Sequence, residues 1–89
     1  MALLKKIVLD VLKPHQPNVL ELSQALADAG DDYRVRLTVI EVDEKTETVQ
    51  IELEGNAIDF EAVKSVINGM GGSLHSIDEV DVASEVKAG

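Results

Sequence analysis

The sequence contains no cysteine, and its 89 residues include only two aromatic side chains, Tyr33 and Phe60. Without cysteine, the chain forms neither a disulfide nor a thiolate metal site. Two aromatic residues are too few to build a stacking platform for single-stranded nucleic acid. These absences exclude disulfide-stapled scaffolds, thiolate metal proteins and nucleic-acid binders that rely on base stacking.

Long apolar runs and basic residues are also scarce. Lys5 and Lys6 precede an apolar run, but Asp10 interrupts it well before the ~20 residues that a membrane span needs. The net charge is −9, from 8 basic and 17 acidic residues. Nucleic-acid affinity comes mainly from phosphate neutralisation by lysine and arginine, so this balance opposes it. We therefore expect a soluble, cytoplasmic protein that binds neither nucleic acid nor membranes.

The chain length fits one domain, which we expect over residues 1–83, followed by a frayed C-terminal tail of small and polar residues at 84–89. A domain of this size buries only roughly 60% of the surface that its unfolded chain exposes. Its stability as a monomer is therefore expected to be modest.

The segment from Ile7 to Leu12 is apolar at every position except Asp10. In a strand, alternate side chains point to opposite faces, so this segment presents apolar side chains to both. Such a pattern is typical of a central strand that is covered on both sides. Asp10 places a carboxylate in an otherwise apolar face, where an unpaired charge would be costly, so it is expected to have a partner.

The remaining sequence alternates between strand and helix patterns. Asn18 and Glu21 have the spacing of a capping box, and Asp59 can cap a second helix. The elements are predicted as strand 4–12, helix 18–30, strand 34–42, strand 48–54, helix 59–69 and strand 73–82. The β-α-β-β-α-β order predicts a ferredoxin-like α+β sandwich, with a four-stranded antiparallel sheet in the order 4-1-3-2 and both helices on one face.

This topology gathers polar side chains at one end of the sheet. We predict a divalent-cation or small-ligand site there, because imidazole together with carboxylate suits zinc, nickel, manganese or iron. The spacing matches no established metal motif. The alternative is that Asp10 and His75 form a structural pair across adjacent strands and that His15 is a solvated loop residue. The candidate metal ligands are Asp10, His15, His75, Asp78 and Glu79.

Catalytic motifs are not evident. Ser73, His75 and Ser76 are near neighbours, but adjacent strand residues point to opposite faces, so they predict no nucleophile–base pair. The glycine-rich segment 69–72 follows a helix instead of opening one, which indicates helix termination and not a phosphate-binding loop. We therefore predict a non-enzymatic protein.

Segments 8–15 and 71–80, together with residues 41–43 and 46–47, resemble the archaeal family known as domain of unknown function 211. The resemblance extends over nearly the whole chain. It implies a ferredoxin-like fold and assembly into closed homo-oligomers. The family has no assigned activity or agreed site, so no functional residue is carried over. The short tail after Val82 departs from the family pattern and would weaken any contact that the tail makes.

Two functional hypotheses follow. The first is a homo-oligomeric binding module that holds a divalent cation or a small polar ligand at the polar end. The second is a ligand-sensing regulatory domain similar to the amino-acid-binding ACT type, which shares the β-α-β-β-α-β order. Those domains often have a glycine-containing turn after the first strand, whereas the turn at 13–17 has none.

The helix-free face of the sheet is the expected oligomer contact, because the two helices cover only the other face. Exposed aliphatic side chains gathered on such a face would favour self-association. The side chains expected there are Val8, Leu12, Ile40 and Val42.

Overall fold

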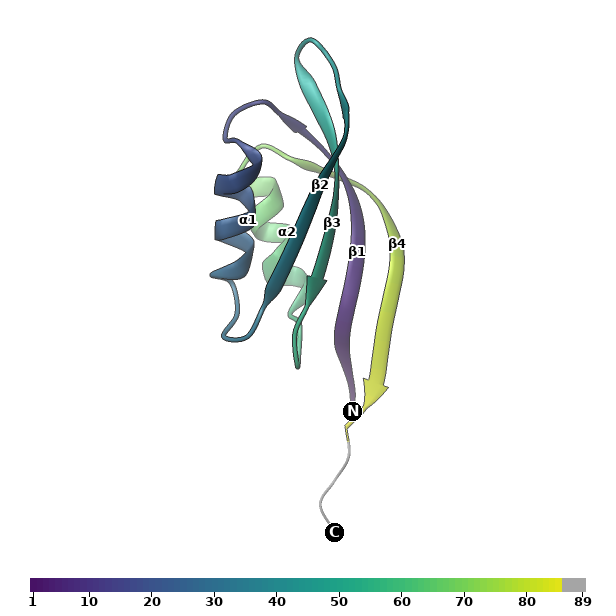
Figure 1. The fold of residues 1–89 in the computed structure, drawn as a ribbon. Helices are drawn as coiled ribbons and strands as arrows, with labels where there is room; N and C mark the ends of the chain where they lie inside the picture. Colours follow the sequence, from purple (N-terminus) through teal and green to yellow (C-terminus); the bar gives the residue numbers. More distant parts are fainter. Residues whose placement is uncertain (86–89) are drawn as a thin grey trace.

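The computed structural model describes residues 1–85 and contains one four-stranded sheet and two helices. The sheet order is β2-β3-β1-β4, and every neighbouring pair is antiparallel. Both helices lie on one face of the sheet (Figure 1). The predicted ferredoxin-like fold and strand order are therefore confirmed. The elements are β1 (Ala2–Pro14), α1 (Val19–Ala27), β2 (Arg34–Val42), β3 (Thr46–Glu54), α2 (Phe60–Gly69) and β4 (Ser73–Ser84).

The helices begin and end where local hydrogen bonds satisfy their free backbone groups. Asn18 Oδ1 accepts from the Glu21 backbone N–H at 2.9 Å, and Glu21 Oε1 accepts from the Asn18 N–H at 3.4 Å, so the predicted capping box is present. Asp59 Oδ1 accepts from the Ala62 N–H at 3.2 Å, as a cap of α2 should.

The glycine-rich segment after α2 is a helix terminator, as predicted. Gly71 has φ +83°, a left-handed conformation that favours glycine. The Gly72 N–H donates to the Ile67 carbonyl and the Gly71 N–H to the Asn68 carbonyl, at 2.9 and 3.1 Å. These two bonds form a Schellman motif, which ends the helix and directs the chain into β4.

The core lies between the helices and one face of the central strands. The odd-numbered residues of β1, Ile7, Leu9 and Val11, face the helices together with the alternate residues of β3. Both sets are almost fully buried, whereas Gln50 and Glu54 on the other face of β3 are exposed. The buried apolar residues are Ile7, Leu9, Val11, Leu22, Leu26, Val49, Ile51, Leu53, Ile58, Val63 and Ile67.

The two edge strands contain register shifts that the sequence pattern did not indicate. In β4, His75 and Asp78 are extra residues that oppose no partner of their own on β1. In β2, Ile40 is the extra residue opposite β3. An extra residue shifts the alternation of side chains between the two faces for the rest of the strand.

These shifts and the local packing correct the aliphatic patch expected on the helix-free face. Val42 is the cross-strand partner of Glu47, which also pairs with Lys13, so Val42 lies on the helix side. Val8 is only 8% exposed. Its neighbours on that face, Glu52 and Glu79, are both bridged to Lys6, and these charged side chains flank it. The expected patch is thus reduced to Leu12 and Ile40, which are exposed.

The end of the chain continues the sheet slightly past the boundary expected at residue 83. β4 ends at Ser84, and the Glu85 N–H donates to the Met1 carbonyl at 2.8 Å. Residues 86–89 of the predicted tail lie outside the described residues.

The buried row of β3 provides a direct test of this packing. Ile51 is fully buried, so Ile51→Ala is expected to lower the free energy of unfolding by about 2–5 kcal/mol, because it leaves a cavity. Gln50→Ala, on the exposed neighbour, is the control and should change it by less than about 0.5 kcal/mol. Urea denaturation at one protein concentration measures both; equal costs would contradict the assigned faces.

Candidate functional site

A small pocket on the helix-free face brings Asp10 and His75 together. It has a volume of about 160 Å³ and is lined by Asp10 and Leu12 of β1, Thr48 of β3 and His75 of β4. Asp10 pairs across the strands with Ser76, and the adjacent extra residue of β4 is His75. The register shift in β4 thus places the imidazole on the same face as the Asp10 carboxylate.

The Asp10 and His75 side chains form no hydrogen bond with each other. Among the described residues, neither makes a side-chain hydrogen bond or an ion pair. The alternative of a structural pair is therefore not present as a direct contact. Asp10, His75 and Thr48 instead line a pocket that is open to a further group.

His15 lies in a different place and has a structural contact. Its Nε2 atom is 3.0 Å from the Asp43 carbonyl and 3.1 Å from the Glu44 carbonyl. Carbonyl oxygens only accept, so Nε2 carries a proton and donates to both. His15 Nδ1 is 3.8 Å from Glu47 Oε1. The ring therefore ties the loop after β1 to the turn between β2 and β3.

Asp78 and Glu79 are also occupied elsewhere. The Ser76 hydroxyl donates to Asp78 Oδ1 at 2.7 Å. Lys6 Nζ bridges Glu79 at 3.0 Å and Glu52 at 3.1 Å. The hydrogen bond to Glu79 raises the pKa of Lys6 above its ordinary value, and the hydrogen bond to Glu52 adds a smaller increase. The bridge links three adjacent strands.

The five predicted metal ligands consequently do not converge within one chain. Over residues 1–85, no three histidine, aspartate or glutamate side chains lie close enough together to hold a metal ion. Asp10 and His75 are the two that the structure places on one pocket. A cation bound there would take its other ligands from water or from a second molecule.

Sequence reasoning missed Lys13, which is only 1% exposed. Its Nζ donates to the Pro14 carbonyl at 2.7 Å and to Glu47 Oε1 at 3.0 Å. The signal was available, because Lys13 continues the odd-numbered row of Ile7, Leu9 and Val11 that faces the helices. Since Glu47 is its cross-strand partner, this buried ion pair joins the end of β1 to the start of β3.

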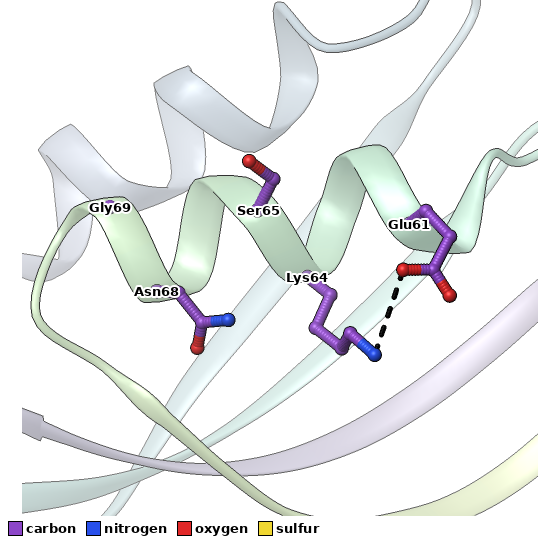
Figure 2. A pocket seen from close by; sticks show the side chains of 5 residues that line it. All are labelled: Glu61, Lys64, Ser65, Asn68 and Gly69. Atoms are coloured by element: carbon purple, nitrogen blue, oxygen red, sulfur yellow. Dashed lines mark ion pairs between the residues drawn. The ribbon is translucent and has the colours of Figure 1, made fainter.

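The outer face of α2 carries a shallow depression with no catalytic arrangement (Figure 2). Lys64 Nζ pairs with Glu61 Oε2 at 3.6 Å and lies 5.6 Å from the centre of the Phe60 ring. Figure 2 shows the Ser65 side chain pointing away from Lys64, so the two do not form a nucleophile–base pair.

Neither helix of the described chain is long and apolar enough to cross a membrane.

Comparison with known proteins identifies a family over most of the chain. The family model for domain of unknown function 211, described as "Uncharacterized ArCR", matches residues 5–87. The chain belongs to this family. It is also 39% identical over 83 residues to the uncharacterised protein MJ0319 of Methanocaldococcus jannaschii, a match that covers 93% of this chain and 86% of the relative. The family and the relative carry no assigned activity in their descriptions.

The buried Lys13–Glu47 pair leads to a stability prediction. Lys13→Met is expected to cost about 3 kcal/mol of unfolding free energy, because it leaves the Glu47 carboxylate without its buried partner. Lys45→Met, an exposed lysine of the neighbouring turn, is the control and should stay within about 0.5 kcal/mol. Guanidinium denaturation measures both, and a Lys13 variant as stable as the control would show that the pair contributes little.

Proposed function

We propose that this protein is a non-catalytic homo-oligomeric binding module. The observation that carries the proposal is the set of aliphatic side chains left in solvent on both edge strands. These residues, between 40% and 64% exposed, are Val39, Ile40 and Val42 on β2 and Ile77, Val80 and Val82 on β4. A contact between copies would remove them from water.

The energetic argument is strongest at the edges of the sheet. Burying an aliphatic side chain completely recovers about 1.5–3 kcal/mol, which matters for a domain with a small core. The edge strands also present backbone groups that pair with no strand on their outer side. In Figure 1, β4 lies at the edge of the sheet away from both helices. Self-association thus covers both apolar and backbone groups.

The test is a mass measurement by light scattering after size exclusion. At micromolar concentration, the wild-type protein is expected to have a mass of several 9.6 kDa chains. Val80→Lys should lower this mass, because it places a charge among the exposed aliphatic residues of β4. Leu20→Lys is the matched control on α1, where leucine is also exposed. A wild-type mass of one chain would contradict the proposal.

The ligand that the module binds is proposed from the Asp10–His75 pocket. A carboxylate and an imidazole without side-chain partners favour a divalent cation such as zinc or manganese. The size of the pocket, together with the Thr48 hydroxyl and the Leu12 side chain, also suits a small polar molecule. The cation is the first candidate, because carboxylate and imidazole groups are both ligands of divalent metals.

Binding can be tested by native mass spectrometry and titration calorimetry with zinc and manganese chloride, followed by the common amino acids. Asp10→Asn and His75→Ala are each expected to lower affinity by at least tenfold for whichever probe binds. His15→Ala removes a histidine outside the pocket and should leave affinity unchanged. If Asp10→Asn alters neither bound metal, assembly nor stability, Asp10 has no part in a site.

A further inference from the structure

The cross-strand register aligns charged side chains into two rows on the helix-free face. Both rows begin with an arginine on the free edge of β2 and end with a carboxylate on the free edge of β4. One row is Arg34, Glu54, Lys6 and Asp81; the other is Arg36, Glu52, Val8 and Glu79. The two edges of one molecule thus carry opposite charges at positions that belong to the same cross-strand row.

The arginine edge has unused binding capacity. Arg34 and Arg36 are the only arginines of the chain, and both are exposed. With Glu52 and Glu54 they line a pocket of about 200 Å³. Among the described residues, neither guanidinium makes an ion pair within 4.0 Å. Two unpaired guanidinium groups in a chain of net charge −9 favour an acidic partner.

On the face that carries the helices, the same two edges are apolar. Two further rows of cross-strand partners lie there. One is Val35, Leu53, Ile7 and Val80; the other is Leu37, Ile51, Leu9 and Ile77. Their inner members are at most 2% exposed, whereas Ile77 and Val80 on β4 are 50% and 56% exposed. These rows therefore end in half-exposed aliphatic side chains on β4, the strand that lies away from both helices in Figure 1.

The strand directions allow one copy to continue the sheet of another. β2 is antiparallel to β3, β3 to β1 and β1 to β4, so β2 and β4 run in opposite directions. When a second copy is placed beside the first in the same orientation, its β2 is antiparallel to the first copy's β4. An antiparallel ladder can then form between them without inverting either copy.

We propose that copies of this chain associate head to tail, with β4 of one chain pairing with β2 of the next in the register that continues these rows. The proposal rests on the proposed homo-oligomeric function and identifies its interface. Asp81 then lies beside Arg34 of the next copy and Glu79 beside Arg36, while Val80 and Ile77 meet Val35 and Leu37. Because this contact joins two different surfaces, each added copy leaves one edge free for the next copy. The assembly closes into a ring when a whole number of these rotations makes a full turn.

Complementary charge reversals test this interface. One variant carries Arg34→Glu with Arg36→Glu, and the other carries Glu79→Arg with Asp81→Arg. Each alone opposes like charges at every contact and is expected to have the mass of one chain by light scattering. Their equimolar mixture should assemble again, because the acidic β2 of the first then meets the basic β4 of the second, and the unaltered edges also match.

Matched controls separate interface effects from net charge. Lys45→Glu with Lys64→Glu, and Asp31→Arg with Glu44→Arg, change the charge equally at positions outside both edges and should assemble normally. Because Glu79 also pairs with Lys6, the single variants Arg34→Glu and Asp81→Arg repeat the test without disturbing that bridge. Far-UV circular dichroism verifies that each variant is folded.

The outcomes distinguish the interface from the assembly itself. If the wild-type protein assembles and the arginine variant assembles equally well, the head-to-tail contact is wrong while the homo-oligomer stands. Loss of assembly only in the β4 variant would point to a β4–β4 contact and overturn the proposal. Failure of the mixture to assemble also overturns it, and a monomeric wild-type protein removes both proposals.

Discussion

The structure depends on the two-sided pairing of β1. This strand forms ladders with β3 and β4 along most of its length, and its odd-numbered side chains provide the centre of the core. Because strand side chains alternate, the same backbone presents a different set of residues to the opposite face. The positions of Asp10 and Lys13 are both consequences of that one constraint, since Asp10 falls on the helix-free side and Lys13 on the buried side.

The consequence for Lys13 is an ion pair within a nearly closed environment. Burial of an ammonium group is costly unless a partner and further hydrogen bonds compensate for the lost water. Glu47 Oε1 and the Pro14 carbonyl fill those roles, and His15 reaches toward the same carboxylate from the loop. These contacts hold the end of β1 against the β2–β3 turn, next to the strands that form the Asp10 pocket. They account for polar residues at this end of the molecule without requiring chemistry.

The helix-free face divides into regions with different properties. Its upper part contains the pocket lined by Asp10, Thr48 and His75, whereas its lower part carries the charged rows that include Lys6. The proposed ligand and the proposed contact between copies therefore rest on different side chains. A ligand effect and an assembly effect can be separated, because the residues that define one region are absent from the other.

The sequence by itself determined the order of elements, the caps of both helices and the ferredoxin-like topology. These features depend on short-range patterns: side-chain alternation, capping side chains and glycine after a helix. Tertiary structure decided which residues oppose one another across strands that are distant in the chain. The extra residues His75, Asp78 and Ile40 change that register, so His75 lies on the same face as Asp10 and Val42 changes face. A register shift of this kind depends on pairing with another strand, and no local pattern in β2 or β4 encodes it.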